Sequence, residues 1–239
     1  MTFCILAFAS DGWVMAADRR EQNQLGGTWH GTRLLDSAMK ICWNEKAGVA
    51  CCFSGDIIAR KIAEGIVTAI RRKTLDFDNL RHADERGEVL KTTANDIFRE
   101  VKTDWGDKLG AFERTVLVVL ATGEVWRLAG WDGMGAQRID YKKGAICIGD
   151  APNPAAYLTQ RFYPASTDLK TVDELMFLIG HCVLEAGALN PTGVEGLDLL
   201  TYRTQPSAGF HLLDDLELKS LKKRSAETFQ KISRLLFSS

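Results

Sequence analysis

The fold is decided by residues 1–20, MTFCILAFASDGWVMAADRR. Two apolar runs, 3–9 and 13–17, flank Ser10-Asp11-Gly12, and an Asp-Gly pair between short runs rich in β-branched and aromatic residues is typical of a β-hairpin. In runs this short, periodicity alone does not exclude a helix, but the flanking turn residues favour strands. The unbroken apolar run 3–9 predicts a strand that is buried on both faces.

Three charged residues, Asp18, Arg19 and Arg20, follow the hairpin directly. Charges in this position either mark the protein surface or line a site. Thr2 offers the matching chemistry, because Met1 is removed efficiently before a small residue and a threonine would then begin the mature chain. Its free α-amino group, with an ordinary pKa of about 7.7 to 8.0, can take the proton of its own hydroxyl. Thr2 can equally be the plain start of a strand, so by itself it is weak support.

The pattern of Thr2, an apolar strand, an Asp-Gly turn, a second strand and then Ala16-Ala17-Asp18-Arg19-Arg20 resembles the start of proteasome β-type subunits and their bacterial relatives, the HslV and Anbu proteins. In that family an acidic residue follows the nucleophilic threonine by the spacing seen from Thr2 to Asp18. Residues 38–41, with Lys40, and 53–56, with Gly55, resemble two further family segments. The three motifs together are specific, whereas beyond about residue 72 the resemblance rests on element order.

The resemblance implies an α+β protein, the four-layer αββα sandwich of N-terminal-nucleophile hydrolases. Thr2 would be the nucleophile, with Lys40 beside it and Asp18 holding Lys40 in place. The Gly55 N–H would stabilise the oxyanion. Phe53, two residues before Gly55, resembles the residue that lines the pocket for the side chain preceding the cut, which predicts a preference for small or medium side chains. The plain alternatives are a solvated strand-edge charge for Lys40 and a simple strand-to-helix turn for Gly55.

Two positions depart from the family pattern. The family usually has a serine where this chain has Asp150, and an aspartate where this chain has Asn190. Asn190 can accept a hydrogen bond but supplies no negative charge, although Asp150 could restore an acidic group. The sequence therefore predicts a threonine peptidase subunit, with an inactive ring that acts as a scaffold or binding shell as the alternative. An amidase of the same fold acting on a small molecule is a third option.

Composition predicts one domain spanning residues 1–239 and excludes several partners. The chain has 239 residues, 46% hydrophobic and 26% charged, with a net charge of −1. That balance gives no long-range attraction to nucleic acid or to an anionic membrane. No apolar run reaches the roughly 18 to 20 residues of a membrane span, and the first residues lack the features of a signal peptide, which predicts a cytoplasmic protein.

Cysteine and histidine spacing predicts no metal and no cofactor. The six cysteines lie mostly in apolar runs without a C-x-x-C pair, so they are expected to be reduced and to pack as small hydrophobes. The four histidines lack i, i+4 spacing. The expected partners are a peptide or unfolded-protein substrate, other copies of the chain in a homo-oligomeric ring, and an ATP-dependent unfoldase as an optional addition.

The rest of the chain predicts alternating groups of strands and helices. Polar, glycine-containing residues 21–37 predict a long loop, and Asp56 is a favoured N-cap for a helix through residue 72. Thr171 and Glu174 form a capping-box pattern that opens a later helix. Further expected elements are strands at 41–43, 47–53, 115–121, 125–128, 144–149, 196–202 and 210–213, and helices ending at 105 and 162. A basic amphipathic helix at about 216–237 forms a C-terminal extension, and such helices are packed or solvated more often than membrane-bound.

Overall fold

The computed structural model describes residues 3–25, 28–34, 39–75, 77, 80, 82–105, 113–140, 144–149, 154–165, 168–189, 196–204 and 209–237. The strands in these ranges are β1 Phe3–Ala9, β2 Gly12–Ala17, β3 Arg20–Leu25, β4 Thr28–Leu34, β5 Ile41–Asn44, β6 Val49–Ser54, β7 Arg114–Leu120, β8 Val125–Gly130, β9 Gly135–Ile139, β10 Ala145–Gly149, β11 Asp198–Arg203 and β12 Gly209–Leu212. The helices are α1 Ile57–Arg71, α2 Ala83–Trp105, α3 Pro154–Phe162, α4 Val172–Leu189 and α5 Asp215–Phe237.

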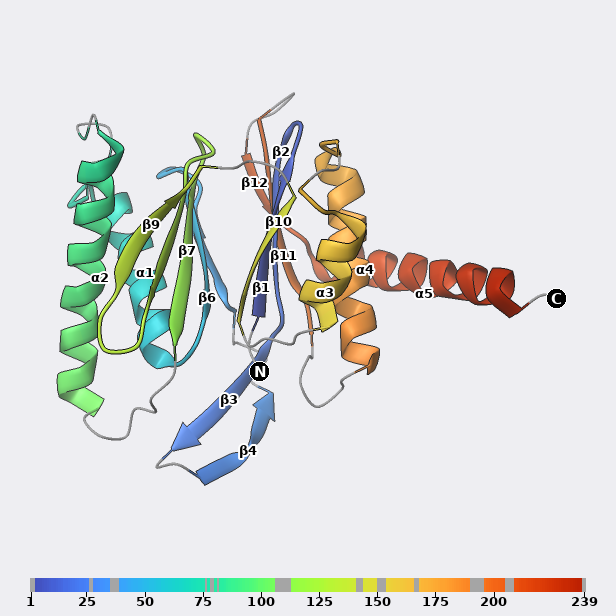
Figure 1. Ribbon diagram of the computed structural model, residues 1–239, viewed down its shortest axis with the longest axis horizontal. Helices are drawn as coiled ribbons and strands as arrows, with labels where there is room; N and C mark the ends of the chain where they lie inside the picture. Colours follow the sequence, from blue (N-terminus) through green and yellow to red (C-terminus); the bar gives the residue numbers. More distant parts are fainter. Residues whose placement is uncertain are drawn as a thin grey trace.

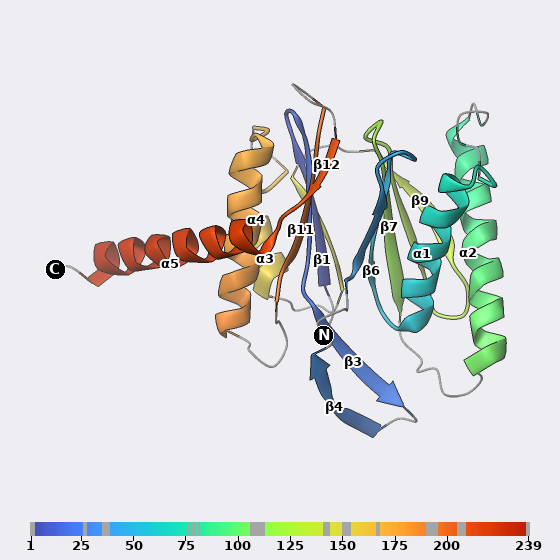
Figure 2. The same ribbon diagram turned by 180° about the vertical axis from the view of Figure 1, so that it is seen from behind.

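The described elements form four layers. One antiparallel sheet has the strand order β10-β1-β2-β11-β12, and a second has the order β5-β6-β7-β8-β9. The two sheets face each other, with α1 and α2 on the outer face of the second sheet and α3 and α4 on the outer face of the first (Figure 1). The same order is seen from behind (Figure 2). The predicted α+β sandwich with helices on both outer faces is confirmed.

Three apolar cores separate these layers. The core between the sheets is built from alternate residues of their strands, which is why β1 and β6 are apolar on both faces. It contains Cys4, Leu6, Phe8, Trp13, Met15, Ile41, Cys52, Leu117 and Leu200 among others. The residues between them in sequence face the helices, with Cys51 and Phe53 of β6 packed toward α1 and Ile5 and Ala7 of β1 packed in the core that includes α4 residues.

The opening hairpin is present as the Asp-Gly signal predicts. Leu6 pairs with Met15 and Ala9 pairs with Gly12, so β1 and β2 are joined at Ser10-Asp11. Gly12 has a φ of +155°, and a Cβ atom there would lie 1.9 Å from the Tyr202 carbonyl oxygen of the neighbouring strand. Only glycine allows β11 to approach the hairpin this closely.

Both helix starts that the sequence indicates are confirmed. The Asp56 carboxylate accepts hydrogen bonds from the amides of Ile58 and Ala59 at 3.0 and 3.4 Å, so Asp56 caps α1. The Thr171 hydroxyl accepts from the Glu174 amide at 3.3 Å, and the Glu174 carboxylate accepts from the Thr171 amide at 2.9 Å. This reciprocal pair is a capping box at the start of α4.

Two predictions about local structure were wrong. Residues 21–37, predicted as a loop, include most of β3 and all of β4, which form a separate antiparallel hairpin beyond the stacked sheets (Figures 1 and 2). These strands are polar, so they lack the apolar alternation that marks a half-buried strand, and the pairing is irregular between Gln22 and Gln24. The expected strands also omitted β9, an edge strand with mostly exposed residues.

The predicted C-terminal helix is present as α5, and its second half projects away from the rest of the molecule (Figures 1 and 2). Its first half is seated on α4, where Gly180 leaves room for the Leu221 side chain. Phe229 and Ile232, which follow the buried Ser225 along the helix, are exposed.

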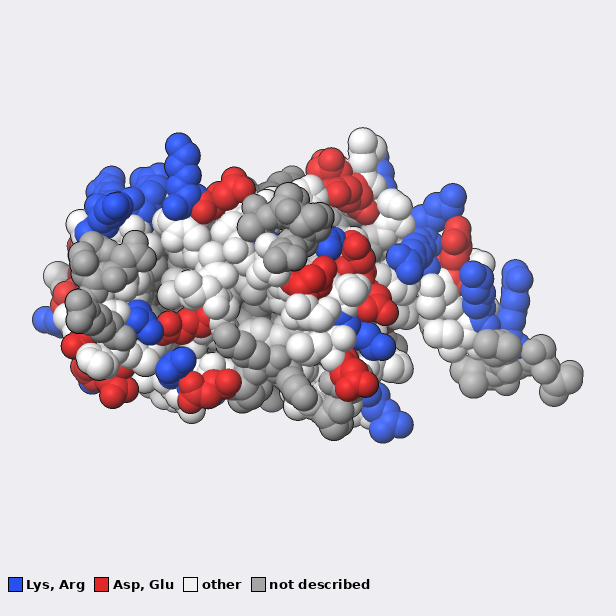
Figure 3. Space-filling view, turned by 90° about the horizontal axis from the view of Figure 1, so that it is seen from above, with Lys and Arg blue, Asp and Glu red and all other residues white. Residues whose placement is uncertain are grey.

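Viewed from above, Lys and Arg side chains and acidic side chains are both spread over the molecule, so this face carries no single sign of charge (Figure 3). Among the described helices, none is long and apolar enough to cross a membrane.

All six cysteines are free thiols. Cys4, Cys51, Cys52 and Cys182 are buried, in agreement with their predicted role as small apolar residues. Burial raises the pKa of the Cys42 thiol and that of the Cys147 thiol to about 12, so both stay protonated near neutral pH. These thiols are poor nucleophiles, because the thiolate is the reactive form.

Candidate active site

Asp18 lies at the end of β2, next to the start of β1. The last pair of the hairpin joins Cys4 to Ala17, so the side chain of the next residue can reach back to the first strand. The Asp18 carboxylate accepts a hydrogen bond from the Phe3 amide at 3.1 Å and is fully buried. The sequence left open whether the charges after the hairpin lie on the surface or line a site. Burial of Asp18 excludes a surface position for this residue.

Lys40, at the start of the second sheet, contacts the Asp18 carboxylate. It precedes β5, and its carbonyl oxygen accepts a hydrogen bond from the Phe53 amide of β6 at 3.2 Å. Its ammonium group donates to Asp18 Oδ1 at 2.7 Å, and both side chains are 0% exposed. The alternative of a solvated strand-edge lysine is thus excluded. Removing one partner of such a pair typically costs about 3–5 kcal/mol, because the other charge stays buried and unpaired.

Among the described residues, the Lys40 ammonium uses one of its N–H donors. A lysine has three N–H donors, and among the described residues only Asp18 accepts one of them. Water is excluded from the pair, which strengthens the electrostatic effect of the remaining donors on any group that enters. The pair can therefore orient and stabilise a reacting group that approaches the ammonium from the chain's first residues or from a substrate.

Gly55 lies where β6 ends and α1 begins. Its φ is +132°, and a Cβ atom there would lie 3.2 Å from the Ala59 Cβ and 3.3 Å from the Arg114 Cα. The turn thus requires glycine, as its plain reading predicted. The proposed role of the Gly55 N–H toward an oxyanion stays a prediction.

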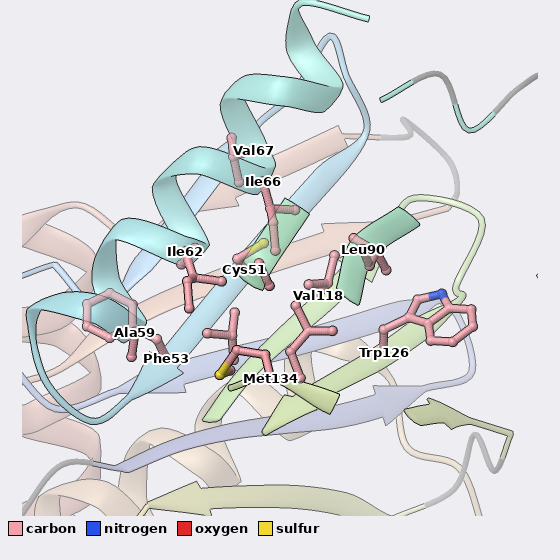
Figure 4. Packing of buried hydrophobic residues seen from close by; sticks show 14 of the residues in the cluster. Cys51, Phe53, Ala59, Ile62, Ile66, Val67, Leu90, Val118, Trp126 and Met134 are labelled. Atoms are coloured by element: carbon pink, nitrogen blue, oxygen red, sulfur yellow. The ribbon is translucent and has the colours of Figure 1, made fainter. Parts of the chain in front are cut away.

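Phe53 was predicted to line a substrate pocket, and this role stays a prediction. Its side chain is 2% exposed and lies with Ala59 and Ile62 of α1 in the core between the second sheet and its helices (Figure 4). Successive residues of a strand face opposite sides of its sheet. In β6, Phe53 faces the helices and Cys52 faces the core between the two sheets. The expected preference for small or medium side chains likewise stays a prediction.

Three of the predicted site residues, Thr2, Asp150 and Asn190, lie outside the described residues. The structure brings together Asp18 and Lys40, which are 22 positions apart in sequence, and it places Phe53 and Gly55 on the adjoining end of β6. Within the described part of the chain, no group of three or more His, Cys, Asp and Glu residues could hold a metal ion.

A second ion pair beside this site was missed at the level of sequence. Arg19 Nε donates to Asp198 Oδ1 at 2.7 Å, and Asp198 is 1% exposed. Burial raises the pKa of the Asp198 carboxyl, while the hydrogen bond from Arg19 and the positive charges of Arg19 and Lys40 act in the opposite direction. The available signal was a carboxylate at the first position of an apolar strand, Asp198-Leu199-Leu200.

Two stacked antiparallel sheets between helical layers, with the first strand beginning next to a buried lysine–aspartate pair, define a proteasome-like α+β fold. Two solved structures share it. Anbu (ancestral beta-subunit) from Yersinia bercovieri has a TM-score of 0.62 and 15% identity, with 96% of each chain covered. The helical assembly of the Anbu complex from Pseudomonas aeruginosa has a TM-score of 0.64 and 14% identity, with 97% of this chain and 96% of that chain covered.

At these identities the likeness establishes the fold alone. No protein-family model matches the chain, and none of the curated proteins does. The three-dimensional comparison supports the order of elements. The sequence resemblance rested on this order beyond residue 72.

Proposed function

We propose that this chain is a threonine-type peptidase subunit of a self-compartmentalising homo-oligomeric ring, with Thr2 as the N-terminal nucleophile after loss of Met1. The observation that carries the proposal is the fully buried Asp18–Lys40 pair, whose carboxylate is bonded to the Phe3 amide. That amide nitrogen is the atom joined to residue 2, so the pair is one residue from the proposed nucleophile. A structural ion pair has no need to be placed there.

The proposed reaction uses the chain's own amine as base. Thr2 Oγ attacks the carbonyl carbon of a peptide bond while its proton passes to the α-amino group, directly or through water. The Gly55 N–H donates to the oxyanion, and the Lys40 ammonium stabilises negative charge nearby. When the intermediate collapses, the C–N bond breaks, the leaving amine takes the proton, and an ester to Thr2 remains. Water then hydrolyses the ester and restores the hydroxyl.

Asp150 and Asn190, the proposed supporting residues of the site, decide between an active peptidase and an inactive ring. Asp150 and Asn190 stand where the resembling family usually has a serine and an aspartate. If the altered residues do not support turnover, the same fold serves as a scaffold or binding shell. The proposed substrates are peptides or unfolded proteins, and an ATP-dependent unfoldase that feeds the ring is an optional partner. Assembly is proposed because a protein of the same fold, the Anbu complex from Pseudomonas aeruginosa, forms a helical assembly.

The deciding experiment is incubation with a peptide epoxyketone, followed by intact mass measurement. This reagent needs both the hydroxyl and the free amine of an N-terminal threonine. Protein shown to begin at Thr2 should gain one inhibitor mass per chain, and protein that keeps Met1 should gain none. A processed protein that stays unmodified at saturating reagent would favour the scaffold. Light scattering of the same sample measures whether it is assembled.

A further inference from the structure

Asp198 is a buried carboxylate that uses one of its two oxygens among the described residues. It lies at the first position of β11, directly opposite Ala17 of β2, so it adjoins the strand end that carries Asp18 and Arg19. Oδ1 accepts the hydrogen bond from Arg19 Nε at 2.7 Å. Oδ2 is buried and accepts no hydrogen bond within the described part of the chain. An unsatisfied buried acceptor is costly, and a charged one more so, so a charged group at this position calls for an explanation.

The surroundings of Arg19 are shaped to hold its side chain. Gly196 has a φ of +71°, and a Cβ atom there would lie 2.8 Å from the Arg19 Cβ. The aliphatic stem of Arg19 therefore packs on the backbone two residues before Asp198, while the side chain remains 34% exposed. The glycine and the carboxylate together fix the guanidinium at the edge of the site.

An asparagine at position 198 would serve a structural link equally well. Its side-chain oxygen could accept the Arg19 bond, and a neutral amide is cheaper to bury than a carboxylate. What asparagine lacks is the negative charge. The charged groups that act on Asp198 among the described residues are Arg19 and Lys40, and Lys40 is the residue paired with Asp18.

We propose that Asp198 is a positioning residue of the proposed peptidase site, which supplies a second negative charge to Lys40 and is itself balanced by Arg19. Asp18, Lys40, Asp198 and Arg19 then form one network of alternating charge, closed to water except at Arg19. The network sets the charge state in which the site's base works. This inference rests on the proposed function, because the base in question is the amine of Thr2.

The network predicts opposite shifts from two substitutions. A negative charge favours the protonated form of a neighbouring base, so Asp198→Asn should move the acidic limb of the kcat/KM profile to lower pH. Arg19→Gln leaves the Asp198 charge unbalanced, so the same limb should move to higher pH. Each shift should be roughly 0.5 to 1 pH unit, with KM changed less than about twofold. Arg19→Lys, which keeps the charge, should largely restore the wild-type profile.

The matched control is Glu124→Gln. Glu124 is 12% exposed and pairs with Arg86 at 3.0 Å. This pair lies next to the β7–β8 turn, at the opposite end of β7 from Arg114, which adjoins Gly55. This variant should leave the profile unchanged. Shifts of the same sign in Asp198→Asn and Arg19→Gln, or no shift in either, would overturn the network. Because Arg19 is partly exposed, its variant tests the proposal even if Asp198→Asn folds poorly.

A second readout does not depend on turnover. Urea unfolding of the wild type, Asp198→Asn, Lys40→Met and the double variant gives a thermodynamic cycle. The network predicts that the double variant loses less stability than the sum of the two single losses, because either substitution removes the same attraction. Additive losses would overturn the network. An inactive wild type that forms no epoxyketone adduct would instead overturn the proposed function, while the cycle still decides the network.

Discussion

Two buried ion pairs lie near the end of β6, and they differ in how fully their polar atoms are used. The Asp56 carboxylate accepts from Arg114 through both oxygens, at 2.9 and 2.7 Å, and also caps α1. The remaining Arg114 nitrogen donates to the Trp131 carbonyl at 2.6 Å. In the Asp18–Lys40 pair, by contrast, the ammonium has one acceptor among the described residues.

The difference separates a structural pair from one with capacity for chemistry. Asp56–Arg114 joins the start of a helix to the start of β7, and each group is satisfied by the protein. Asp18–Lys40 is more deeply buried and joins the two sheets, and within the described ranges it engages only one Lys40 donor. Substitutions at the first pair should therefore change stability with little effect on turnover, and those at the second should change turnover as well as stability.

The largest effect is expected from Thr2→Ala, which leaves both ion pairs in place. Peptide hydrolysis should fall by more than about 10³-fold, because the nucleophile is lost. Stability should change by less than about 0.5 kcal/mol, since a hydroxyl and a methyl group at a chain end contribute little. Rates with a fluorogenic peptide and urea unfolding measure the two quantities. Undiminished hydrolysis by a variant shown to have lost Met1 would refute the catalytic assignment.

Lys40→Ala should reduce both quantities. Turnover should fall by about 10²-fold or more, and the free energy of unfolding by about 3–5 kcal/mol, because the buried Asp18 carboxylate loses its lysine partner. Asp18→Ala should come close behind. The sharper test is the double variant Asp18→Asn with Lys40→Met, in which no charge is unpaired. It should recover most of the stability and none of the activity, and recovery of both would show that this pair is structural too.

Asp56→Ala should lower stability and largely spare turnover. It removes the cap of α1 and takes the carboxylate away from the nearly buried Arg114, which should lower the free energy of unfolding by about 3–5 kcal/mol. Turnover per folded molecule should stay within about tenfold of the wild type. Circular dichroism at increasing urea gives the stability, and active-site titration with the epoxyketone normalises the rate. A large loss of turnover in fully folded protein would remove the distinction between the pairs.

The contrast also shows what could be predicted from the sequence. Asp56 as a cap and the hairpin around Asp11-Gly12 depend on residues within a few positions of each other, so local patterns were enough. Asp18 and Lys40 came from the family resemblance. The Arg19–Asp198 pair joins residues 179 positions apart and has no local signature.

Strand phase decides on which side of the sheet Phe53 packs. In a strand buried on both faces, the sequence VACCF is apolar at every position and does not reveal which residues face the helices. That phase is set by the pairing of Phe53 with Val116 of β7 and by the packing of α1. The β3–β4 hairpin was missed for the reverse reason, because its strands carry no apolar pattern at all.

The Arg19–Asp198 pair falls between the two others, since Asp198 uses one oxygen and the other is buried without a hydrogen bond from any described residue. Burial is the largest influence on it and raises the pKa of its carboxyl above the ordinary value of 3.8. An acid with a raised pKa binds its proton more tightly in the folded state than in the unfolded state. Between pH 3.8 and the raised value, this group therefore favours folding increasingly as the pH falls.

The smallest predicted effect follows from this sign. Asp198→Asn cannot titrate, so the stability of the wild type relative to the variant should increase as the pH is lowered through that window. The slope should be at most about 1.4 kcal/mol per pH unit for one group. Urea midpoints of both proteins at matched pH values measure the difference, and subtraction removes the carboxylates they share. A difference that is constant, or that shrinks as acid is added, would mean that burial does not dominate at Asp198 and that Arg19 satisfies this carboxylate as fully as Arg114 satisfies Asp56.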